Sequence, residues 1–137
     1  MRAVLDTNVL ISGVIATGVP HELLVKGFER EYQLVVSVET LTEFRETLLK
    51  YPERFQMSEH EVQQEAELVR YYSEFVDPQE DIKAVEADPD DDKFLEAVVA
   101  GGVDYVVSGD GHLLGLDLFR GIDIVEPRTF YDRLDVS

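Results

Sequence analysis

The sequence contains no cysteine, few basic residues and no long hydrophobic run, and each absence narrows the range of functions. Without cysteine, the chain can form no disulfide, no zinc site with thiolate ligands and no cysteine nucleophile. The hydrophobic runs are too short to cross a bilayer, and the first acid, Asp6, comes too early for a secretory signal peptide. We therefore expect a cytoplasmic protein with no membrane segment.

Basic residues are outnumbered by acids, with 12 Lys and Arg against 29 Asp and Glu and a net charge of −17. The acids are spread among apolar residues, which argues against a disordered acidic tail. Mimicry of nucleic acid would not require acids at strand ends. We favour a surface adapted to high salt, because salt screens repulsion between like charges over a Debye length of about 3 Å at 1 M.

Short apolar runs alternate with helical patterns along the chain. Strands are expected at residues 2–5, 32–36, 104–108 and 122–125, and helices at 8–16, 21–29, 40–50, from 58 onward, 92–100 and 127–134. An acidic connector is expected over residues 74–92. The hydrophobic content of 45% and the length suit a single domain over residues 1–137. The alternation predicts a three-layer α/β/α sandwich around a central, mainly parallel sheet.

Acidic residues follow two of the expected strands. Asp6 comes directly after the first apolar run, and Asp110 follows residues 105–108 between two glycines. In an open α/β sheet, ligands gather at the carboxyl ends of the strands. Several carboxylates at that edge, without thiolates or a suitable histidine pair, would favour Mg²⁺ or Mn²⁺. The alternatives are that Asp6 or Thr7 only caps the next helix and that Asp110 belongs to an ordinary turn.

Glu43 lies in the expected helix 40–50, beside an apolar stripe that includes Phe44. From this border it could lean over the strand ends. It could equally be a solvated glutamate, or form a capping box with Thr40.

A run of acids, Asp88-Pro89-Asp90-Asp91-Asp92, leads into the expected helix 92–100. Capping and the helix dipole explain one or two of these acids but do not need four. An EF-hand loop is excluded, because Lys93 stands where that loop requires glycine and Val99 stands where it requires glutamate.

Taken in order, these motifs resemble the PIN-domain nucleases, especially the small toxin-component type of bacteria and archaea. The matching segments are residues 4–12, Ser37 with Glu43, residues 88–97 and residues 104–110. The resemblance implies a PIN-like fold and a metal-dependent endoribonuclease. Its catalytic and metal-binding acids would be Asp6, Glu43, Asp92 and Asp110, supported by Thr7, Asn8, Ser108 and Asp91. Asp90 or Asp91 could replace Asp92 if the helix starts differently.

The resemblance also implies how such an enzyme would work. Mg²⁺ or Mn²⁺ would activate water for in-line attack on an RNA phosphodiester. We expect single-stranded or looped RNA, because its bases are exposed. Local contacts would come from basic residues: Arg45, Lys50, Lys93, Arg120 and Arg128. A small antitoxin and a second copy of the chain are the implied protein partners.

Two other function classes compete with the nuclease. A phosphatase of the haloacid-dehalogenase type would need aspartate where Asn8 stands. A non-catalytic interaction module with a PIN-like fold is the better alternative, and it would bind no Mn²⁺.

Overall fold

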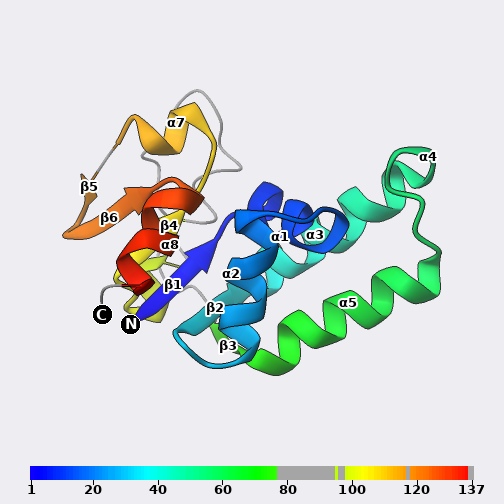
Figure 1. The fold of residues 1–137 in the computed structure, drawn as a ribbon, viewed down its shortest axis with the longest axis horizontal. Coiled ribbons are helices and arrows are strands. Elements are labelled where there is room, and N and C mark those ends of the chain that lie inside the picture. The colour runs from blue at the N-terminus through cyan, green and yellow to red at the C-terminus, as the bar shows by residue number, and fades with distance from the viewer. Residues whose placement is uncertain (77–94, 96–97, 117, 136–137) are drawn as a thin grey trace.

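A six-stranded sheet in the order β3-β2-β1-β4-β6-β5 forms the centre of the computed structural model, which describes residues 1–76, 95, 98–116 and 118–135 (Figure 1). The strands are β1 (Arg2–Leu5), β2 (Gln33–Ser37), β3 (Ser73–Val76), β4 (Tyr105–Val107), β5 (Leu118–Phe119) and β6 (Ile122–Val125). All neighbouring strands pair in parallel except β5, which is antiparallel to β6. The pairing sets Leu5 beside Val107, so β1 and β4 end together.

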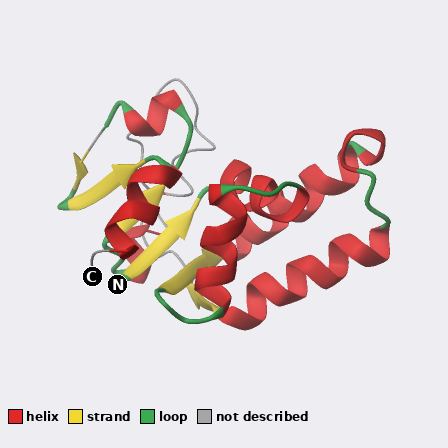
Figure 2. Ribbon diagram, in the orientation of Figure 1, coloured by secondary structure: helices red, strands yellow, loops and turns green. Residues whose placement is uncertain are grey.

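Helices cover both faces of the sheet (Figure 2). They are α1 (Thr7–Ile15), α2 (Val19–Phe28), α3 (Val38–Lys50), α4 (Pro52–Phe55), α5 (Glu59–Tyr72), α7 (Gly111–Leu114) and α8 (Pro127–Asp135). Residues 95 and 98–101 are also helical. Alternate residues of the strands enter two separate cores: Leu5 packs in the core that contains Phe44, and Val4 in the core that contains Leu95 and Leu113. The expected three-layer α/β/α sandwich is confirmed.

A pair of helices, α3 and α5, extends from one side of the sheet and is joined at its tip by α4; we call α3, α4 and α5 together the arm (Figure 1). Ser37 caps α3, with its hydroxyl oxygen accepting from the Thr40 N–H at 3.2 Å. Ser58 and Glu61 form the expected capping box at the start of α5. Both helices join the sheet directly, because β2 ends at Ser37 and β3 begins at Ser73.

Four short elements were not expected from the sequence: β3, β5, α4 and α7. Strand β3 carries Glu74 and has no fully buried residue, so its sequence lacks the apolar run of a central strand. Strand β5 has two residues and α4 and α7 four each, which is too short for a periodic pattern. Residues 92–94, 96 and 97 of one expected helix lie outside the described residues, as does most of the acidic connector.

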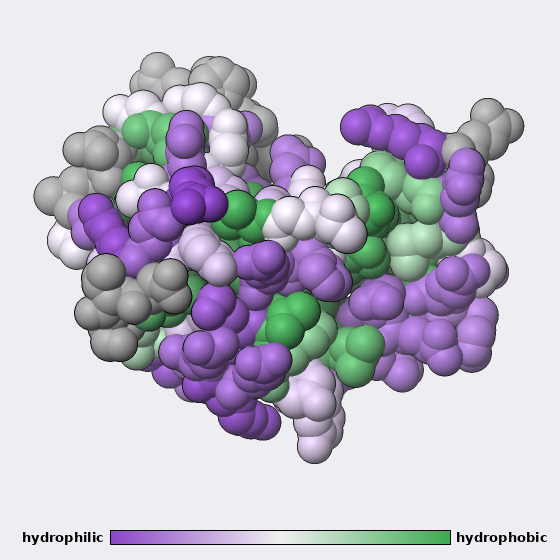
Figure 3. Space-filling view, in the orientation of Figure 1, coloured by the Kyte–Doolittle hydropathy of each residue, from purple (hydrophilic) through white to green (hydrophobic). Residues whose placement is uncertain are grey.

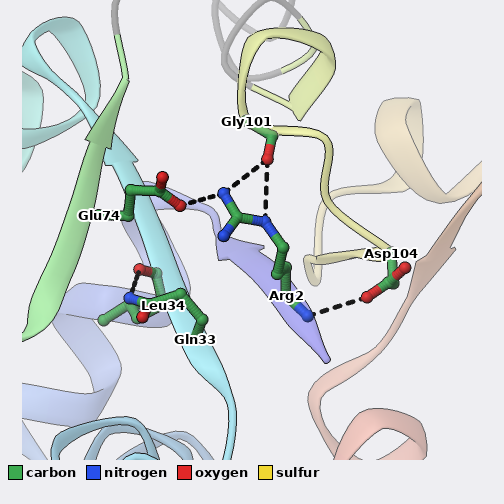
Figure 4. A network of polar contacts seen from close by, with 6 residues as sticks. All are labelled: Arg2, Gln33, Leu34, Glu74, Gly101 and Asp104. Atoms are coloured by element: carbon green, nitrogen blue, oxygen red, sulfur yellow. Dashed lines mark hydrogen bonds and ion pairs between the residues drawn. The ribbon is translucent and has the colours of Figure 1, made fainter.

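Arg2 ties the amino-terminal end of β1 to its surroundings (Figure 4). Its Nε and Nη2 donate to the carbonyl oxygen of Gly101 at 3.0 and 2.7 Å, and its guanidinium pairs with Glu74. A side chain at position 101 would meet Val35, with its Cβ only 2.7 Å from the valine Cγ1, so the backbone approaches the sheet closely there. This polar network lies at the opposite end of β1 from Asp6.

Among the described residues, no single helix is long and apolar enough to cross a membrane. Helices α1 and α2 meet the length and composition criteria only when taken together, and they are bent by 95° relative to each other.

Candidate active site

The carboxylate of Asp6 lies at the junction between β1 and α1 and is 4% exposed. The backbone at Asp6 is extended, and its Oδ1 accepts a hydrogen bond from the Val9 N–H at 2.8 Å, which caps α1. The Asp6 N–H donates to the Val107 carbonyl at 3.0 Å and so continues the pairing between β1 and β4. Asp6 is therefore the cap of α1, and the same contacts fix it at the carboxyl edge of the sheet.

Ser108 connects the ends of β1 and β4. Its hydroxyl donates to Asp6 Oδ2 and accepts from the Asp110 N–H at 2.9 Å. The side chain is fully buried, and the Ser108 N–H donates to the Val125 carbonyl of β6 at 2.9 Å. One hydroxyl thus holds together two acidic residues that are 104 positions apart in the sequence.

Asp110 is half-buried just beyond β4. Its Oδ1 accepts from the Leu113 N–H at 3.4 Å, at the start of α7. Burial raises the pKa of Asp6 above its ordinary value, hydrogen bonds from Ser108 and the Val9 N–H oppose this rise, and the charge of Asp110 adds to it. The two carboxylates therefore repel each other, with Asp6 shielded from water and Asp110 partly exposed to it.

Thr7 and Asn8 differ sharply in their surroundings. Thr7 is buried, and its hydroxyl has no hydrogen-bond partner within the described part of the chain. Asn8 is exposed on the first turn of α1. Only Asn8 is therefore placed to meet a ligand approaching from solvent.

The other candidate acids are not part of this group in the described structure. Glu43 is half-buried on α3, between the buried Leu41 and Phe44. Asp90, Asp91 and Asp92 lie outside the described residues. Within the ranges that the structure describes, no three His, Cys, Asp or Glu side chains gather closely enough to hold a metal ion. The structure thus brings Asp6, Ser108 and Asp110 together. Glu43 does not form a metal-binding group with them among the described residues, and Asp92 lies outside those residues.

The donors that do come together fit a hard divalent cation. All are oxygens, and Mg²⁺ commonly binds through one or two carboxylates with water and phosphate completing its shell. No basic side chain of the described residues pairs with Asp6. A cation shared with Asp110 would offset the cost of ionising the buried Asp6 carboxylate.

A groove begins at Asn8 and is walled by α1, α3 and α4, and it was not predicted from the sequence. A signal for it was present: Asn8, Ile11, Ser12 and Ile15 are spaced as one face of a helix.

Comparison with known proteins shows which family the chain matches. Residues 2–112 match the family described as PIN domain. No curated protein matches the chain. Among solved structures, the crystal structure of PAE2754 from Pyrobaculum aerophilum is similar, with a TM-score of 0.65 and 13% sequence identity over 100% of this chain and 91% of that one. At this identity the likeness shows a shared fold.

Proposed function

Because the chain belongs to the PIN domain family, whose members are generally nucleases, we propose that it is a metal-dependent endoribonuclease. The observation that carries the proposal is the pair of acids, Asp6 and Asp110, joined by Ser108 at the carboxyl edge of the sheet. Their burial, mutual repulsion and oxygen-only chemistry suit Mg²⁺ or Mn²⁺.

The proposed ligands are Asp6 and Asp110, with Glu43 and Asp92 completing the acidic set. When bound there, Mg²⁺ or Mn²⁺ supplies an activated water for phosphodiester hydrolysis and stabilises charge on the phosphate oxygens. Ser108 and the Val9 N–H orient Asp6 by occupying one carboxylate oxygen each. Asn8 is exposed and lies two positions after Asp6 in the sequence, so it is placed to contact the substrate.

We propose further that the protein is the toxin of a toxin–antitoxin pair, acts on single-stranded or looped RNA, and forms a homodimer. The support is the resemblance of its ordered motifs to the small toxin-component type. Exposed bases also suit a protein whose net charge is unfavourable for binding through phosphates alone.

Calorimetric titration with Mn²⁺ in high KCl tests the metal site. We expect wild-type protein to bind Mn²⁺ and the double variant Asp6→Asn/Asp110→Asn to lose binding. Asp104→Asn is the matched control, because Asp104 lies at the amino-terminal end of β4 and an asparagine oxygen can still accept from the Arg2 N–H.

RNA cleavage by the wild-type protein and by the two single variants tests the activity. Asp6→Asn and Asp110→Asn should each abolish cleavage while the protein stays folded. Cleavage retained by both variants would refute the assignment of these residues. Failure of folded wild-type protein to bind Mn²⁺ would instead favour the non-catalytic interaction module.

A further inference from the structure

A groove of about 330 Å³ runs along α1 from Asn8, two residues after the Asp6 carboxylate. One wall is a single face of α1, formed by residues at positions i, i+3, i+4 and i+7: Asn8, Ile11, Ser12 and Ile15. The other wall comes from the arm: Thr47, Tyr51, Arg54 and Phe55. Asn8 and Ile15 are separated by about 10 Å along the helix axis, so the groove leads away from the acidic site over that length.

The arm's wall presents aromatic surface to solvent. Tyr51 is 45% exposed, and its ring meets that of Phe55 edge to face with a centroid separation of 6.4 Å. The Tyr51 carbonyl accepts from the N–H groups of Arg54 and Phe55 at 3.1 and 3.0 Å, which fixes the turn that carries both rings. Figure 3 shows apolar surface over this part of the arm, bordered by hydrophilic side chains.

Two cations, Lys50 and Arg54, stand beside these rings. Lys50 lies over the Tyr51 ring, 5.5 Å from its centroid, and Arg54 lies over the Phe55 ring at 5.2 Å. Neither forms an ion pair with any described residue. In a chain with a net charge of −17, two cations that pair with no described acid and lie beside an open aromatic groove mark a place where negative charge is accepted.

We propose that this groove holds a nucleotide of single-stranded RNA next to the scissile phosphate, with its base stacked on Tyr51 and a phosphate contacted by Arg54. The inference rests on the proposed function for the identity of the ligand. Aromatic faces accept any base by stacking, and guanidinium groups suit phosphate. The groove's volume lies at the low end of small-ligand sites, which suits one nucleotide and is too small for a duplex.

Two pairs of variants separate this role from general effects of charge and aromatic content. Arg54→Gln is matched by Arg70→Gln on α5, since Arg70 is also exposed and has a ring contact, with Phe75 at 5.3 Å. Tyr51→Leu is matched by Tyr71→Leu, since Tyr71 is 73% exposed and also meets a neighbouring ring edge to face. Tyr51→Phe keeps the stacking surface and should bind like wild type.

Binding is measured by fluorescence anisotropy with a labelled, random-sequence single-stranded oligoribonucleotide in chelator, over a range of KCl concentrations. Tyr51→Leu should weaken binding by about 5- to 150-fold, the range found for loss of one stacked base. Arg54→Gln should weaken binding and make the slope of log K against log salt less negative by about 0.7, the value for one phosphate contact on a single strand. The Arg70 and Tyr71 variants should leave both quantities unchanged.

Cleavage with Mn²⁺, measured in parallel, separates this inference from the proposed function. Weaker binding confined to Tyr51→Leu and Arg54→Gln supports the groove, even if no protein cleaves RNA, in which case the nuclease proposal alone fails. Wild-type cleavage with unchanged binding and KM in both groove variants overturns the groove and leaves the nuclease standing. Equal losses in the groove and control variants, or no binding by folded wild-type protein, also overturn the groove.

Discussion

At the scale of single residues, Asp6 has two roles that conflict energetically. As the cap of α1 it stabilises the helix, while as a buried acid near Asp110 it is costly to ionise. Asparagine can keep the cap and remove the charge, whereas alanine removes both. A comparison of these substitutions therefore separates the structural role of Asp6 from its electrostatic cost.

In chelator at neutral pH, Asp6→Asn should melt at or above the wild-type temperature, and Asp6→Ala should be about 1 kcal/mol less stable than Asp6→Asn because its cap is lost. An acid whose pKa is raised by folding binds its proton more tightly in the folded state. Its contribution to stability is therefore present at low pH and is lost as pH rises through the folded pKa.

The advantage of Asp6→Asn over wild type should accordingly shrink as pH falls and Asp6 becomes protonated. Chemical denaturation of both proteins across a pH series checks this sign. An advantage that grows toward low pH would show that ionised Asp6 stabilises the fold.

At the scale of elements, the capping residues of the two long helices were not equally visible in the sequence. Ser58 and Glu61 gave the start of α5, because both partners of a capping box stand at their usual spacing. The pattern predicts a strand ending at residue 36 and a helix starting at Thr40, whereas β2 continues to Ser37 and α3 starts at Val38, two residues earlier. Ser37 is both the last residue of β2 and the N-cap of α3. Such a direct strand-to-helix junction has no polar or glycine-rich loop that would reveal it in the sequence.

The meeting of Asp6 and Asp110 could be anticipated from the sequence in the same way. Both follow short apolar runs, and parallel strands end at a common edge. Whether Glu43 joins these two acids could not be anticipated, since it depends on the orientation of α3 relative to the sheet. No local sequence pattern encodes that orientation.

Ser37→Ala should destabilise the protein more than Ser58→Ala. The Ser58 cap is exposed and is worth about 1 kcal/mol. Loss of the Ser37 hydroxyl also leaves the buried Thr40 hydroxyl without the partner it has at 3.0 Å, which adds about 1–3 kcal/mol. Urea denaturation of the two variants measures the difference.

Only Ser37→Ala should also reduce cleavage, because α3 carries the proposed ligand Glu43. Equal cleavage by the two variants at a temperature where both are folded would argue against a role for α3 in the site.

At the scale of the whole molecule, the ion pairs that the described residues form do little to offset the acidic surface. Those among the described residues include Lys26 with Glu31, Arg128 with Asp132 and Arg133 with Asp123, all at least partly exposed. Such pairs contribute about 0–1 kcal/mol each. The net charge of −17 therefore acts mainly as self-repulsion, which favours expansion of the chain.

Thermal unfolding across a KCl series should show the melting temperature rising into the molar range, as the Debye length falls from about 10 Å at 0.1 M to about 3 Å at 1 M. Most of the increase should come at the lower concentrations if screening alone is responsible. A flat response would contradict the proposed adaptation to salt.

The direct joining of the arm to the sheet restricts how this protein can change in length. Each residue inserted at the junction of β2 with α3 would turn the helix by about 100° and swing the buried side chains of Leu41, Phe44 and Leu48 away from their core. An insertion at the tip, between α4 and α5, would not rotate the buried side chains of α3. Related proteins with longer or shorter arms should therefore differ at the tip, where a new recognition surface could be added without disturbing the acids at the other end.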